Sequence, residues 1–147
     1  VGLMFDGIDR ERKLIQAVVR AVKEEFPEKK VVIAGYSDYR RLGSISPFEI
    51  SSLAAEAGAD VAMVDTGIKD GRSTFEFMDE ESLVRFCTLN RDGGMATALA
   101  GSLKFEDIPA LKRIGPDIIG VRGMVCGGDR NDGIREELVD RLVRMVH

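Results

Sequence analysis

Hydrophobic and polar positions follow two alternating patterns along the chain, one typical of amphipathic helices and one typical of buried strands. Between residues 8 and 26, apolar side chains such as Leu14 and Val18 recur at helical spacing, and charged side chains occupy the opposite face. Residues 30–36 are a short, mainly apolar run, as expected for a strand covered on both faces of a sheet. Residues 1–4 resemble the end of an earlier strand, so we expect a strand before the first helix.

The same two patterns repeat toward the C-terminus. Strands are predicted at 60–65, 95–100 and 117–121, and helices at 46–58, 79–89, 105–114 and 134–146. Ser46, Pro47 and Glu49 are typical of a helix start, and Gly58 is typical of a helix end. This alternation predicts parallel strands joined by helical crossovers. Two architectures have that order, a (β/α)₈ barrel and an open flavodoxin-like sheet, and both bind ligands at the C-terminal ends of their strands.

Glycine-containing loops follow the last two predicted strands. One contains Gly101 and Ser102, and the other contains Gly120, Arg122 and Gly123. In (β/α)₈ barrels, the loops after the seventh and eighth strands commonly bind phosphate. Glycine lets backbone N–H groups approach the anion, a helix N-terminus adds partial positive charge, and an arginine adds a charge-assisted hydrogen bond. The two loops therefore predict a phosphate site. The alternative is that the glycines only permit tight turns.

These loops favour the barrel over the open sheet. We interpret residues 1–147 as a single partial domain that covers roughly the C-terminal half of a (β/α)₈ TIM barrel, about four βα units. A full barrel has about 250 residues, so we expect that a further segment precedes Val1. Half a barrel has open sheet edges and an uncovered inner face. We therefore expect a homo-oligomer, or pairing with the missing half of the barrel.

A lysine and a carboxylate follow the strand predicted at 60–65. Asp65 ends this strand, and Lys69 lies four residues further on. A lysine can form an imine with a carbonyl compound or transfer a proton, and a neighbouring carboxylate can move a proton at the adjacent carbon. We predict that both are catalytic; the alternative is an ordinary ion pair. Tyr36 and Asp38, after an earlier strand, are further candidates for lining the pocket, although such a tyrosine more often packs.

Composition excludes several classes of function. The net charge is −4 without a cluster of Lys or Arg, which argues against binding nucleic acid. No apolar stretch approaches the roughly 18 residues that a membrane span requires. His147 is the only histidine, and Cys87 and Cys126 are too few for a metal ribbon or a disulfide framework. We therefore expect a cytoplasmic protein without a metal or cofactor.

Several stretches resemble a known family. Gly43–Pro47, Asp65–Gly71, Ala98–Pro109 and Ile114–Gly123 are similar to the (5-formylfuran-3-yl)methyl phosphate synthases of methanofuran biosynthesis, and the similarity runs nearly end to end. The resemblance implies a (β/α)₈ barrel. It also implies a lyase that condenses two glyceraldehyde 3-phosphate molecules into 4-(hydroxymethyl)-2-furancarboxaldehyde phosphate, with loss of phosphate and water. The mechanism resembles that of class I aldolases, in which a lysine forms a Schiff base.

The resemblance also suggests roles for individual residues. Asp65 and Lys69 match positions that assist acid–base steps, and Gly101-Ser102 and Arg122-Gly123 match loops that bind substrate phosphate. The Schiff-base lysine and a second catalytic lysine belong to the family's N-terminal half, before the segment that matches residues 1–3. We therefore expect this chain alone to be inactive.

Two alternatives to an enzyme remain. The chain could be a non-catalytic α/β module that binds a sugar phosphate through the same loops. It could also be a flavodoxin-like signalling receiver with Asp65 as phospho-acceptor. A receiver needs an acidic pair after the first strand, and only Asp6 lies near the predicted strand at residues 1–4.

Overall fold

A parallel sheet forms the centre of the computed structural model, which describes residues 7–129 and 131–147. Its strands are β1 (Val32–Tyr36), β2 (Val61–Asp65), β3 (Ala96–Leu99) and β4 (Ile118–Ile119), and they lie side by side in chain order. Each neighbouring pair is parallel. The predicted α/β class with parallel strands is therefore confirmed. The strand expected at residues 1–4 lies outside the described residues.

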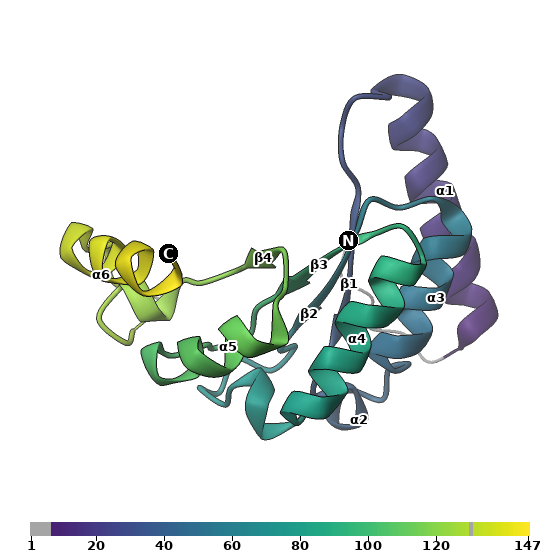
Figure 1. The fold of residues 1–147 in the computed structure, drawn as a ribbon. Coiled ribbons are helices and arrows are strands. Elements are labelled where there is room, and N and C mark those ends of the chain that lie inside the picture. The colour runs from purple at the N-terminus through teal and green to yellow at the C-terminus, as the bar shows by residue number, and fades with distance from the viewer. Residues whose placement is uncertain (1–6, 130) are drawn as a thin grey trace.

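Helices connect the strands. They are α1 (Ile8–Glu25), α2 (Tyr39–Leu42), α3 (Pro47–Ala57), α4 (Glu80–Asp92), α5 (Ile108–Ile114) and α6 (Glu136–Val146), with 3₁₀ turns η1 (Thr74–Glu76), η2 (Phe105–Asp107) and η3 (Gly123–Val125). The helices α1, α3 and α4 lie next to one another along one face of the sheet, and α6 stands apart from them, beyond β4 (Figure 1). None of the helices in the described part of the chain combines the length and apolar character needed to cross a membrane.

Local capping explains where α3 begins and ends. The Ser46 hydroxyl accepts the N–H of Glu49, and the Glu49 carboxylate accepts the N–H of Ser46. Pro47 occupies the first turn, where its missing N–H costs nothing. Gly58 ends the helix at a φ of 78°, which is a left-handed conformation that glycine adopts without strain. The predicted boundaries of this helix are confirmed.

Two elements differ from the sequence-based prediction. The expected strand at 117–121 pairs with β3 only at Ile118 and Ile119. Among the described strands β4 lies at the edge of the sheet, next to β3. The loop after β1 contains the four-residue helix α2, which the sequence does not predict because so short a helix has no hydrophobic period.

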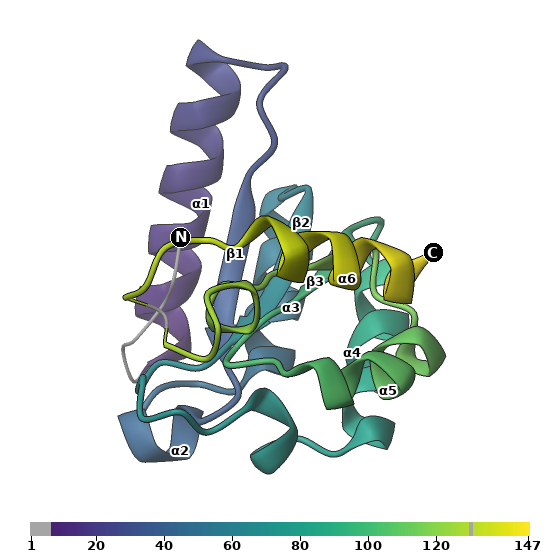
Figure 2. The same ribbon diagram turned by 90° about the vertical axis from the view of Figure 1, so that its left-hand side faces the viewer.

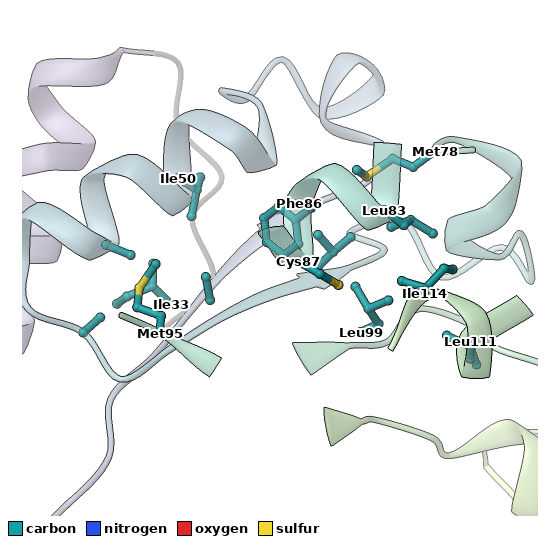
Figure 3. Close-up of a cluster of buried hydrophobic side chains, with 14 of the residues drawn as sticks. Ile33, Ile50, Met78, Leu83, Phe86, Cys87, Met95, Leu99, Leu111 and Ile114 are labelled. Carbon is teal, nitrogen blue, oxygen red and sulfur yellow. The ribbon is translucent and has the colours of Figure 1, made fainter. Parts of the chain in front are cut away.

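The hydrophobic core lies between the sheet and the helices α1, α3, α4 and α5. Ile33 and Leu99 enter it from strands, and Ile50, Leu83 and Phe86 enter it from helices; each is at most 1% exposed (Figure 3). The opposite face of the sheet is more open. In β1, buried residues alternate with half-buried ones, so this strand is fully covered on only one face within the described residues. The sequence had suggested cover on both faces.

Aspartates at the N-terminal ends of two strands bind the backbone of a neighbouring segment. The Asp60 carboxylate, just before β2, accepts the N–H of Val31 at 2.6 Å and forms an ion pair of 2.8 Å with Lys23. Asp117, just before β4, accepts the N–H of Thr97 at 2.8 Å. These contacts fix the edge of the sheet opposite to the strand ends that carry the candidate site.

Candidate functional site

A cavity of about 950 Å³ lies at the C-terminal ends of β2, β3 and β4. All strands of a parallel sheet end at the same edge, and the loops that follow them lie there. Residues far apart in sequence therefore meet at this edge. The two candidate catalytic residues, Asp65 and Lys69, line the cavity. It is also lined by every residue predicted to bind phosphate, which are Gly101, Ser102, Gly120, Arg122 and Gly123.

Asp65 and Lys69 are in direct contact. The Lys69 Nζ atom donates to the Asp65 Oδ1 atom at 2.8 Å and lies 3.3 Å from the Thr66 hydroxyl. The same Asp65 oxygen accepts the N–H of Thr66 at 2.7 Å, which fixes the carboxylate at the end of β2. Both side chains are partly open to the cavity, at 29% exposed for Asp65 and 37% for Lys69. The pair can therefore exchange a proton and still reach a bound ligand.

The turn after β3 has an uncommon backbone conformation. Gly101 has a φ of 99°, and Ser102 follows at 49°, a left-handed conformation in a non-glycine residue. A Cβ atom on Gly101 would lie 2.4 Å from the Thr74 hydroxyl and 2.8 Å from the Thr66 nitrogen, so the position has no space for a side chain. Residues held in such conformations often lie at ligand sites. Here the turn forms part of the cavity wall.

Charged side chains of both signs surround the cavity. Gly120 lies at the end of β4, where a Cβ atom would meet the Ala100 side chain at 3.0 Å, so the two strands approach closely. The cationic lining residues are Lys69, Lys104 and Arg122, and the acidic ones are Asp65, Glu106 and Asp129. Three cations together with glycine-rich turns are suited to holding a phosphate, and the carboxylates are suited to accepting protons. No group of three or more His, Cys, Asp or Glu side chains in the described residues is arranged to hold a metal ion.

Tyr36 and Asp38 lie next to the cavity but do not line it. Burial raises the pKa of the Tyr36 phenol, and the nearby carboxylates of Asp65 and Asp38 raise it further. The phenol therefore remains protonated at neutral pH. Asp38 is buried, and its carboxylate accepts the backbone N–H groups of Gly67 and Ile68. It supports the loop that contains Lys69 from behind.

Buried hydroxyl groups, which the sequence did not single out, connect the strand ends behind the cavity. The Ser37 hydroxyl donates to the Asp65 carbonyl and lies 3.2 Å from the Thr74 hydroxyl. Thr74 donates in turn to the Ala100 carbonyl at 2.7 Å, and its N–H donates to the Gly101 carbonyl at 3.0 Å. These bonds join β1, β2 and β3 into one rigid support. Scattered Ser and Thr residues have no characteristic spacing, so a sequence pattern could not identify them.

A family model described as 4-HFC-P synthase matches residues 1–143, nearly the whole chain. The chain belongs to this family.

Similar proteins from three archaea are each described as a (5-formylfuran-3-yl)methyl phosphate synthase. The protein of Methanosarcina barkeri is 64% identical over 135 residues, which are 92% of this chain and 58% of that protein. The protein of Archaeoglobus fulgidus is 49% identical, over 92% of this chain and 57% of its own length. The protein of Methanocaldococcus jannaschii is 51% identical, over 88% of this chain and 56% of its own length. The chain thus spans a little under three fifths of the length of these relatives.

Proposed function

We propose that these residues form the C-terminal part of a (β/α)₈ barrel enzyme with the activity for which the relatives are named. The enzyme would condense two molecules of glyceraldehyde 3-phosphate into 4-(hydroxymethyl)-2-furancarboxaldehyde phosphate, with loss of one phosphate and of water. The observation that carries the proposal is the cavity at the C-terminal strand ends, where the Asp65–Lys69 pair faces the glycine turns after β3 and β4. A proton-transferring pair beside a phosphate site is what a triose phosphate condensation requires.

The phosphate group of the substrate binds at the two glycine turns in this proposal. Gly101 and Ser102 supply a turn that no side chain obstructs, and Gly120, Arg122 and Gly123 supply the facing turn and a guanidinium. Arginine binds phosphate through two parallel N–H bonds, which also fix the orientation of the ligand. The triose carbons then lie toward Asp65 and Lys69, on the β2 side of the same cavity.

Asp65 and Lys69 perform the proton transfers in this proposal. The Asp65 carboxylate removes a proton from the carbon next to the activated carbonyl group. The Lys69 ammonium donates a proton to the oxygen of the group that leaves, as water or as phosphate. The contact of 2.8 Å between the two side chains allows the proton to return from one to the other between steps. The lysine that forms the Schiff base lies in the N-terminal part of the barrel, so these 147 residues alone bind the substrate without converting it.

A chimeric enzyme tests this proposal. In it, residues 1–147 replace the matching part of the Methanosarcina barkeri relative, and the furan aldehyde product is followed by its absorbance. We expect Asp65→Asn and Lys69→Met each to lower kcat by about 10²–10⁴-fold, as is typical for the loss of a general acid or base, with KM changed much less. Lys13→Met, which removes an exposed lysine of α1, is the matched control and leaves both constants unchanged.

The outcomes of this experiment separate the enzyme from the binding module. If the chimera binds glyceraldehyde 3-phosphate and both variants turn it over at the parent rate, Asp65 and Lys69 have no catalytic role. If the chimera binds the ligand and forms no product, the non-catalytic sugar-phosphate module becomes the better description.

A further inference from the structure

The short helix α2 holds the segment that carries Lys69. We call residues 66–72 the Lys69 loop; it follows β2 and forms one wall of the cavity. Asp38, immediately before α2, is 1% exposed, and its two carboxylate oxygens accept the N–H groups of Gly67 at 2.7 Å and Ile68 at 3.0 Å. Hydrogen bonds from backbone N–H groups to a buried carboxylate are strong. The main chain just before Lys69 is therefore fixed from below (Figure 2 shows α2 at the lower end of the sheet).

Asp38 makes these bonds instead of capping its own helix, α2. It occupies the N-cap position of α2, where an aspartate commonly accepts an N–H group of its own helix. Its side chain makes no such bond here. Both carboxylate oxygens serve the neighbouring loop, so the contribution of this residue goes to the shape of the Lys69 loop more than to the stability of α2.

Two further residues of α2 contact the same loop. Arg41 donates to the Asp70 carboxylate at 2.8 Å and lies 3.7 Å from Asp38. The hydrogen bond from Arg41, followed by that from the Arg72 backbone, holds the pKa of Asp70 below its usual value, so its carboxylate is ionised at neutral pH. Leu42 packs so closely on Gly67 that a Cβ atom there would overlap its side chain. The contacts thus fall on both sides of Lys69.

We infer that Asp38 is a positioning residue for the Lys69–Asp65 pair. The side chain of lysine is long and flexible. Its Nζ atom stays against Asp65 only if the main chain of Lys69 is held at a suitable distance. By holding Gly67 and Ile68, Asp38 keeps the Lys69 ammonium within 2.8 Å of the carboxylate that ends β2. This inference rests on the proposed function, in which that pair transfers protons.

The variant Asp38→Asn tests the inference in the 147-residue chain. Asparagine has the same shape, but one oxygen becomes an NH₂ group that faces an N–H donor. The rate at which acetic anhydride acetylates each lysine, read by mass spectrometry, reports how tightly Lys69 is paired. We expect Lys69 to be acetylated about tenfold faster, the effect of losing one hydrogen bond to a charged group. Amide hydrogen exchange of Gly67 and Ile68 should accelerate to a similar extent.

Asp60→Asn is the matched control. Asp60 also accepts a backbone N–H group, that of Val31, but at the opposite end of the sheet. Its replacement should leave acetylation of Lys69 unchanged. The inference is overturned if Asp38→Asn alters Lys69 no more than Asp60→Asn does. If Asp38→Asn does not fold, Asp38→Glu decides, because it keeps the charge and moves the carboxylate by one methylene group: faster acetylation of Lys69 supports the inference, and an unchanged rate overturns it.

These measurements require no substrate, so they separate the inference from the proposed function. In the chimera, Asp38→Asn should lower kcat and leave KM nearly unchanged, because the phosphate turns are intact. If the chimera proves inactive while Asp38→Asn still exposes Lys69, the proposed function fails and the positioning role stands.

Discussion

At the scale of single residues, the backbone of the Gly101–Ser102 turn connects the fold most directly to the site. Gly101 combines a positive φ with contacts that leave no space for a side chain, because the hydroxyl of Thr74 and the backbone of Thr66 pack against it. Thr74 belongs to the hydrogen-bonded support behind the cavity, and the Thr66 hydroxyl lies 3.3 Å from the Lys69 Nζ atom. The shape of the Gly101–Ser102 turn and the position of the Asp65–Lys69 pair therefore depend on one packed group of atoms.

Gly101→Ala should destabilise the protein by about 2–4 kcal/mol, because a strained φ and a steric overlap act together. Gly115→Ala is the matched control, since Gly115 also has a left-handed φ, of 70°, but open space around its Cβ position. Its cost should be only about 1 kcal/mol, the conformational part alone. Urea unfolding followed by circular dichroism measures both values. Equal costs for the two variants would show that Gly101 is not tightly packed.

At the scale of elements, capping residues made the ends of α3 predictable, whereas α2 and the role of Asp38 depend on tertiary contacts. Ser46, Pro47 and Gly58 predict the ends of α3 because capping is local chemistry. The helix α2 escaped prediction because it is too short to show a hydrophobic period, and two of its residues, Arg41 and Leu42, contact the Lys69 loop. The sequence predicts that Asp38 lies near the site, but it does not predict that Asp38 binds the backbone of the Lys69 loop. That contact joins residues about 30 positions apart and depends on how the two segments pack.

The strand-edge contact of Asp60 should make stability depend on pH. Its hydrogen bond with Lys23, followed by that from the Val31 backbone, lowers the pKa of Asp60 in the folded protein. A lowered folded pKa contributes stability above the unfolded value of about 3.9, and this contribution is lost as the pH falls through the folded pKa. Asp60→Asn should therefore cost about 1 kcal/mol at pH 7, and this cost should shrink as the pH falls below about 3.9.

Urea unfolding of the chain and the variant across this pH range measures the difference. Asp140→Asn, which alters an exposed carboxylate on α6, should show no such dependence. If the cost of Asp60→Asn stays constant down to about pH 2, the ionised carboxylate of Asp60 makes no contribution to the free energy of unfolding.

At the scale of the whole molecule, the sheet has helices along one face, while alternate residues of β1 on the other face are half-buried. Parallel sheets are usually covered on both faces, and in a (β/α)₈ barrel the strands close so that this face becomes the packed interior. The chain spans 58% of the Methanosarcina barkeri relative, which agrees with our proposal that further strands complete the barrel. The alternation of helix and strand predicted the parallel sheet, whereas the closure that we propose cannot be predicted from such local patterns.

The central claim is that the cavity at the ends of β2, β3 and β4 binds a triose phosphate. Titration of the ¹⁵N-labelled chain with glyceraldehyde 3-phosphate, followed by NMR, tests it most directly. We predict that the amide signals of residues 101–104 and 120–123 shift together. Arg122→Gln should weaken binding about tenfold, as expected for a lost charge-assisted bond, whereas Arg85→Gln, which removes a guanidinium stacked on Phe48, should not. Signals that stay in place, or shifts that fall outside these turns, would contradict the account.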